Sequence, residues 1–107
     1  MKYSLSSRNI KKLLQTKPLF SNSLCLSFSA SSDLALGFSL GRWSGSAVVR
    51  NKFKRVARLI FINHQKNKDP LHVLVKPKRA LFQIKDFKNE FLFLLDEAQK
   101  AVALENE

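Results

Sequence analysis

Residues 45–62 have the sequence GSAVVRNKFKRVARLIFI, and the 16 residues from Ala47 to Ile62 contain neither Gly nor Pro. This uninterrupted run predicts a helix, because Gly and Pro are the residues least compatible with a helix interior. At 100° per residue, five apolar positions fall within an arc of about 100°, the usual width of a core-facing stripe. These positions are Val49, Phe53, Val56, Ala57 and Ile60.

The same helix carries a cationic face beside the apolar one. Arg50, Lys54 and Arg58 follow at intervals of four residues, and Asn51 and Arg55 widen the face to an arc of about 140°. No acid lies among them, so like charges destabilise the helix by roughly a few tenths of a kcal/mol per pair. A solvated helix surface, which is the alternative interpretation, usually mixes both signs. We therefore expect an anionic partner to bind this face.

The whole chain shows the same imbalance of charge. Its 107 residues include 19 Lys and Arg against 8 Asp and Glu, a net charge of +11. Residues 1–85 hold 17 of the cations against Asp33 and Asp69, which gives +15, whereas residues 86–107 hold two cations against six acids, which gives −4. Nucleic acid is the predicted partner, because a polyanion replaces the counterions of such a surface. The alternatives are a basic surface that aids solubility and, less favoured, an anionic membrane surface.

Composition limits the class of protein. The apolar fraction of 45% is too high for a disordered basic tail, and no apolar run reaches the roughly 18 residues that span a bilayer. A single domain over residues 1–107 is expected. No apolar signal-peptide core follows the N-terminus, so a cytoplasmic protein is expected. Cys25 is the only cysteine, and with His64 and His72 it makes no zinc ligand set.

The remaining elements follow from periodicity. Residues 7–16 predict a short Ser-capped helix, and residues 86–102 predict a second long helix with apolar positions 87, 91, 94, 95, 98 and 102 on one face, widened by 92 and 93. Residues 24–29 and 34–40 alternate apolar and small residues, which predicts two antiparallel strands joined by a short loop. Residues 71–75 predict another strand, and residues 17–20 a short one. Lys76, Lys78 and Arg79 extend the basic surface past the strand at 71–75.

Catalytic signatures are absent from the sequence. The basic part has only two isolated acids, whereas metal-dependent phosphodiester cleavage gathers several carboxylates. There is no phosphate-binding GxxxxGK[ST] loop and no HExxH motif. His64 and His72 could in principle act as an acid–base pair, but we interpret both as surface or edge residues. No catalytic residue and no metal ligand is predicted in this chain.

Residues 45–58 contain a specific motif. The sequence resembles the protein subunit of bacterial ribonuclease P, whose signature is G-x-A-V-x-R-N-R-x-K-R-x-x-R. The matching positions are Gly45, Ala47, Val48, Arg50, Asn51, Lys54, Arg55 and Arg58, with Lys52 as a conservative match. The order of predicted elements, α-β-β-β-α-β-α, is also similar over nearly the whole chain.

The resemblance implies an α+β fold, a small two-layer α/β sandwich with a left-handed βαβ crossover, similar to a domain of a small-subunit ribosomal protein. That hand is contrary to the usual right-handed rule. It also implies that the chain binds the catalytic RNA of ribonuclease P and the 5′ leader of precursor tRNA, and that the RNA removes the leader with Mg²⁺. By this resemblance the chain is an accessory subunit of an endonuclease, with no membrane partner and no protein partner inferred.

The resemblance also assigns candidate binding residues. The RNA-binding set is Arg42, Arg50, Asn51, Lys52, Lys54, Arg55 and Arg58, and the leader-cleft set is Ile10, Leu14, Phe28 and Lys76. Around the arc of the helix at residues 47–62, four residues should line the cleft: Arg50, Asn51, Lys54 and Arg58. Lys52 and Arg55 should face the catalytic RNA. Ile10 and Leu14 replace an aromatic pair common in the family, and Arg42 is the one cation kept from its V-S-K-K segment.

Phe28 has two possible environments. It shares a strand face with Leu24 and Leu26, so it lies either in the core under the helices or on an open face toward the leader.

Two other functions compete with the leading hypothesis: a ribosomal or ribosome-associated RNA-binding protein without a role in cleavage, and a self-sufficient nuclease.

Overall fold

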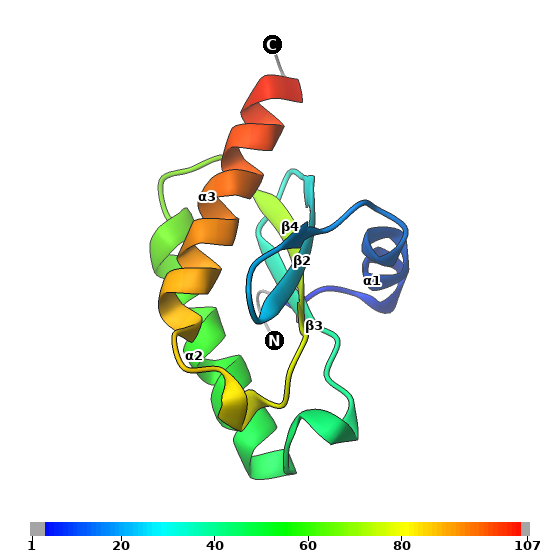
Figure 1. Ribbon diagram of the computed structural model, residues 1–107. Coiled ribbons are helices and arrows are strands. Elements are labelled where there is room, and N and C mark those ends of the chain that lie inside the picture. Colours follow the sequence, from blue (N-terminus) through cyan, green and yellow to red (C-terminus); the bar gives the residue numbers. More distant parts are fainter. Residues whose placement is uncertain (1–3, 106–107) are drawn as a thin grey trace.

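The computed structural model describes residues 4–105, so residues 1–3 and 106–107 of the predicted domain lie outside the described part. One four-stranded sheet separates a short helix from two long ones (Figure 1). The elements in chain order are α1 (Ser7–Leu14), β1 (Leu19–Phe20), β2 (Leu24–Ala30), β3 (Ala35–Phe38), the 3₁₀ turn η1 (Arg42–Ser44), α2 (Ala47–Gln65), β4 (Leu71–Pro77), the 3₁₀ turn η2 (Leu81–Gln83) and α3 (Phe87–Glu105). The predicted order and the α+β class are confirmed.

The predicted pairing of the second and third strands is wrong. The sheet order is β1-β2-β4-β3, so β4 lies between β2 and β3, antiparallel to the first and parallel to the second. β4 takes the centre because Leu71, Val73, Leu74 and Val75 are buried on both of its faces. A near-continuous apolar run is typical of such a central strand, and it was the signal against a local hairpin.

The main core lies between the sheet and the pair α2 and α3, which together form the two-layer sandwich (Figure 1). The predicted stripe of α3 is confirmed, since all of its members are buried apart from half-buried Phe87, although Phe93 is exposed. The stripe of α2 is turned from its predicted position. Ala57 and Phe61 are fully buried, whereas Val49 and Val56 are each 40% exposed. The helix also runs three residues further than predicted, to Gln65.

Helix α1 lies on the opposite face of the sheet (Figure 1). Ser6 caps it by accepting a hydrogen bond from the backbone N–H of Asn9. Leu13 is buried against Leu74 and Ala35, which point to this face, and Leu5 joins them. Gly37 permits the close approach of Leu5, because a Cβ at Gly37 would stand 2.7 Å from the Leu5 Cδ1 atom. The sheet therefore presents one face to a small second core and, beyond α1, to solvent.

Candidate RNA-binding site

The cations of α2 have no acidic partners among residues 4–105. Within that range the ion pairs are His64–Asp96, His72–Asp33 and Lys100–Glu97, and none of them involves a lysine or arginine of α2. The helix begins where the Ser46 hydroxyl accepts a hydrogen bond from the Val49 backbone N–H at 3.3 Å. From there its regular turns place the positive charges in rows along one side.

These charges form two rows with different exposure. Arg50, Lys54 and Arg58, which we call the inner row, are half-buried. Lys52 and Arg55, which we call the outer row, are exposed, as is the neutral Asn51. The Nε atom of Arg50 is buried and has no hydrogen-bond partner within the described residues. A buried donor without a partner is costly to the fold.

The inner row reaches a shallow pocket of about 170 Å³ between α1, β3 and α2. Lys54 and Arg58 line it from α2, Ile10 from α1, and Gly37 and Phe38 from β3, together with Ser4, Leu5 and Leu36. The guanidinium carbon of Arg58 lies 6.0 Å from the centre of the Phe38 ring, which holds the cation at the edge of the sheet. Two cations thus flank an apolar floor, an arrangement suited to a nucleotide.

Two of the four α2 residues expected to line the cleft, Arg50 and Asn51, do not line this pocket. Asn51 is exposed on α2 and does not line it. Lys52 lies on the other flank of the helix, where it lines a pocket with Phe53, Leu81 and Phe87. Lys52 and Lys54 therefore serve different surfaces although they are two residues apart, because successive helical positions turn by about 100°.

The predicted leader-cleft residues are only partly brought together. Ile10 lines the pocket of the inner row, Leu14 is 53% exposed on α1, and Lys76 is exposed on the same face of the sheet as α1. Phe28 points the other way, because it pairs with Val73 and packs half-buried against the main core. Of its two possible environments, Phe28 occupies the core side.

The segment before α2 adds one cation and one aromatic ring. Arg42 opens the turn η1 and is exposed, and Trp43 beside it is 56% exposed. Gly41 allows the indole to approach, since a Cβ there would stand within 3 Å of the Trp43 ring. The buried Ser44 hydroxyl donates to the Gly41 carbonyl at 2.6 Å and fixes this turn.

The two histidines contact different carboxylates. His64 Nε2 lies 2.7 Å from Asp96, and His72 Nε2 lies 2.9 Å from both Asp33 and Ser31. His64 belongs to α2 and His72 to β4, and each contacts a carboxylate rather than the other histidine. The hydrogen bond from His72, followed by that from Ser31, lowers the pKa of Asp33.

Residues 4–105 contain no group of three or more His, Cys, Asp and Glu side chains placed to hold a metal ion. In the same range no helix is both long and apolar enough to cross a membrane.

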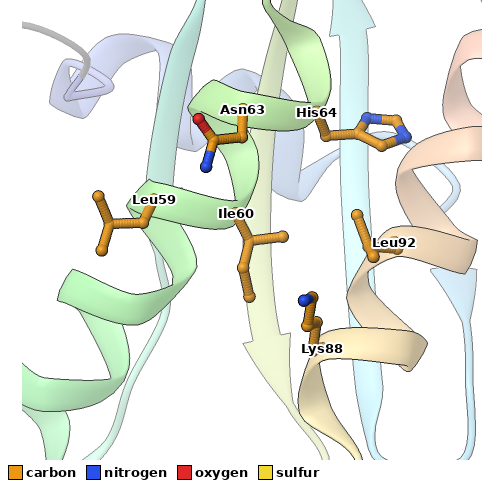
Figure 2. Close-up of a pocket in the computed structure, with 6 residues that line it drawn as sticks. All are labelled: Leu59, Ile60, Asn63, His64, Lys88 and Leu92. Carbon is orange, nitrogen blue, oxygen red and sulfur yellow. The ribbon is translucent and has the colours of Figure 1, made fainter.

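A pocket of about 340 Å³ lies between α2 and α3, and Leu59 is one of the residues that line it. In Figure 2, Ile60 of α2 lies across from Lys88 and Leu92 of α3, His64 lies at one end, and Leu59 points away from α3. Leu59 remains 61% exposed at the rim of this pocket. The pocket lies on the helical layer, on the other side of the sheet from α1.

Sequence reasoning missed Phe20 and the position of Lys78. The Phe20 ring is 58% exposed at the end of β1, and the Lys78 Nζ atom lies 5.5 Å from its centre. Burial raises the pKa of the neighbouring Cys25 thiol, and the positive charges of Lys76 and Lys78 oppose this rise. The sequence signal that could have identified Phe20 was an aromatic residue in a short edge strand, where alternation places it on the face opposite that of Leu19.

Comparisons with known proteins agree with this architecture. A family model described as ribonuclease P matches residues 5–99. The ribonuclease P protein component of Maridesulfovibrio salexigens is 40% identical over 72 residues, which span 63% of this chain and 58% of that protein. The chain thus matches somewhat more than half the length of this curated relative.

Solved structures of the same family share the fold. A mutant of the ribonuclease P protein of Staphylococcus aureus superposes with a TM-score of 0.77 at 19% identity, covering 91% of this chain and 88% of that one. The ribonuclease P protein of Thermotoga maritima gives 0.70 at 24% identity, covering 92% and 96%. With a family model matching residues 5–99 and the signature helix in place, this chain belongs to the ribonuclease P protein family.

Proposed function

We propose that this chain is the protein subunit of a ribonuclease P holoenzyme, in which it binds the catalytic RNA and the 5′ leader of precursor tRNA. The observation that carries the proposal is the inner row of α2, which has no acidic partner among residues 4–105 and places two cations in the pocket with Ile10 and Phe38. Family membership supports the same conclusion.

The two rows of α2 divide the binding of RNA. Lys54 and Arg58 neutralise phosphates of the leader where it enters the pocket, and Ile10 supplies apolar contact there. Lys52 and Arg55 point away from that pocket and bind the catalytic RNA. Arg42 extends the basic surface at the N-terminal end of the helix. Phosphate contacts of this kind depend little on sequence and weaken with salt.

Hydrolysis of the phosphodiester belongs to the RNA subunit in this proposal. Among residues 4–105, no group of three or more His, Cys, Asp and Glu side chains is placed to hold a metal ion. Mg²⁺ is held by the RNA subunit and the substrate, and the protein contributes binding and orientation. The whole chain then acts as one RNA-binding domain in the cytoplasm.

Reconstitution with the cognate catalytic RNA at low Mg²⁺ concentration tests the proposal. We expect the protein to accelerate 5′ maturation of a precursor tRNA and to bind that precursor more tightly than the mature tRNA. Protein without the RNA subunit should show no cleavage, and cleavage by purified protein alone would indicate a self-sufficient nuclease. Absence of any effect on the catalytic RNA, with binding to ribosomal RNA instead, would favour the ribosome-associated alternative.

A further inference from the structure

Phe20 differs from the other exposed phenylalanines of the described chain. Phe20, Phe82 and Phe93 are exposed by 58%, 80% and 55%, but among residues 4–105 a cation lies over only the first of these rings. An exposed ring with an ammonium group beside it combines the two features by which proteins bind single-stranded nucleic acid, a stacking surface and a positive charge for the phosphate.

Lys78 is fixed in place by the turn between β1 and β2. Its Nζ atom donates a hydrogen bond to the Ser21 carbonyl oxygen at 2.9 Å, and its backbone N–H donates to the Ser23 carbonyl oxygen at 2.8 Å. An ammonium group has three N–H donors, so at least one remains for a phosphate oxygen. The charge is therefore positioned before a ligand arrives.

Phe20 lies on the same face of the sheet as α1. Phe20 pairs with Cys25 in β2, and Cys25 pairs with Lys76 in β4. Directly opposite residues of paired strands point to one side, and Lys76 shares that side with Leu74, which contacts α1. The ring, Lys76 and Lys78 thus border the part of the sheet that α1 leaves uncovered.

This position is at the far edge of the sheet from the pocket of the inner row. That pocket includes Phe38 of β3, whereas Phe20 belongs to β1, and two strands lie between them. Three strand spacings of about 4.8 Å make the separation roughly 14 Å. A leader that starts at Lys54 and Arg58 and crosses the sheet past Lys76 reaches Phe20 only after several nucleotides.

We propose that Phe20 and Lys78 form a second nucleotide subsite, in which an unpaired base of a long RNA leader stacks on the Phe20 ring and Lys78 binds a neighbouring phosphate. This inference rests on the proposed function. A single-stranded RNA fits better than a protein or a membrane, because the ring is isolated among Lys76, Lys78 and polar residues such as Ser21 and Asn22. The subsite would make binding depend on leader length.

The experiment compares precursor tRNAs with long and short leaders, using the holoenzyme reconstituted with its catalytic RNA. Phe20→Ala should weaken binding of the long-leader precursor by at least about fivefold, which corresponds to the loss of one base–aromatic stack. Binding of mature tRNA and of a precursor with one or two leader nucleotides should not change. Phe20→Trp should restore the affinity, because the indole retains a stacking surface.

Two matched variants and one spectroscopic probe sharpen the test. Phe82→Ala removes a more exposed ring from a different part of the surface and should leave all affinities unchanged. Lys78→Gln should reduce the salt dependence of long-leader binding by close to one unit. In leaders carrying 2-aminopurine at successive positions, fluorescence should be quenched at one position with the wild-type protein and recover with Phe20→Ala.

The possible failures are distinguishable. If the wild-type holoenzyme prefers the precursor to mature tRNA but Phe20→Ala binds the long leader equally well, the subsite is refuted while the proposed function stands. A Phe20→Ala variant that melts at a lower temperature with unchanged affinity would show that the ring serves only the fold. If the wild-type protein gives no preference for a leader of any length, the proposed leader binding and the subsite fail together.

Discussion

The Glu90 carboxylate accepts a hydrogen bond of 2.7 Å from the backbone N–H of Ser23, a residue 67 positions earlier in the chain. The Ser21 hydroxyl donates to the same oxygen at 2.5 Å, so one side chain of α3 closes the turn between β1 and β2. Lys78, which borders the proposed subsite, donates to the carbonyl oxygen of Ser21 in that turn. The first turn of α3 therefore supports the edge of the sheet where Phe20 lies.

Replacement of Glu90 by Gln should lower the free energy of unfolding by about 1–3 kcal/mol at neutral pH, because the charge-assisted hydrogen bonds from Ser21 and Ser23 are weakened. Urea denaturation measures the change. Glu97→Gln is the control: its contact with Lys100 is 3.7 Å long and exposed, so its loss should cost less than about 0.5 kcal/mol.

The effect of Glu90 should depend on pH. Burial raises the pKa of this carboxyl group, but the hydrogen bonds from Ser21 and Ser23 and the charge of Arg79 outweigh burial and lower it below its usual value. A lowered folded-state pKa stabilises the fold above the pKa of the unfolded chain, and this contribution disappears as the pH falls through the folded-state value. The difference between wild type and Glu90→Gln should therefore shrink in acid, and a difference that grows there would contradict this assignment.

Phe61→Ala should destabilise the protein by about 3–5 kcal/mol, because its ring is fully buried in the main core. Phe28→Ala should cost less, about 2–3 kcal/mol, since this ring is half-buried at the edge of the same core. Thermal or urea unfolding ranks the two variants. Because Phe28 faces away from α1, its removal should leave the preference for leader-bearing tRNA unchanged. A selective loss of leader binding would instead show that Phe28 contacts the leader.

Gln65 and Gln99 should behave as a coupled pair. Gln65 is buried at the end of α2. The side-chain amide of Gln99 in α3 donates to the side-chain oxygen of Gln65 and, at 2.9 Å, to the backbone carbonyl oxygen of Asp69. Gln99→Leu leaves buried polar groups without partners and should cost about 1–3 kcal/mol. The double variant Gln65→Leu with Gln99→Leu should recover much of that loss, and strict additivity in the double-mutant cycle would count against coupling.

The two rows of α2 predict different binding defects. Lys52→Ala and Arg55→Ala should weaken holoenzyme assembly at moderate salt, each reducing the salt dependence by close to one unit. Lys54→Ala should instead reduce affinity for leader-bearing tRNA while assembly remains intact. Electrophoretic or fluorescence titration over a range of salt concentrations separates the two effects. Unchanged assembly of both outer variants would remove Lys52 and Arg55 from the interface with the catalytic RNA.

Local pattern was sufficient for much of this protein. The run without Gly or Pro after Ser46 placed α2, and the spacing of Phe91, Leu94, Leu95 and Ala98 placed the buried face of α3, because helical side-chain directions depend only on local geometry. The unbalanced cations of α2 and the signature around Arg50 indicated an RNA partner for the same reason. Both features lie within one continuous helical segment, so their spacing can be read without knowledge of the tertiary fold.

Tertiary structure decided everything that depends on distant neighbours. Alternation in residues 24–40 correctly marked strands. Only the insertion of β4, which begins 33 residues after the end of β3, determined that β2 and β3 do not pair. In the resulting sheet, Phe28 packs against the main core. Phe20, in a strand of two residues, lies on the open face beside Lys78. A strand pattern specifies that its two faces differ; which face is buried depends on the layer that packs against it.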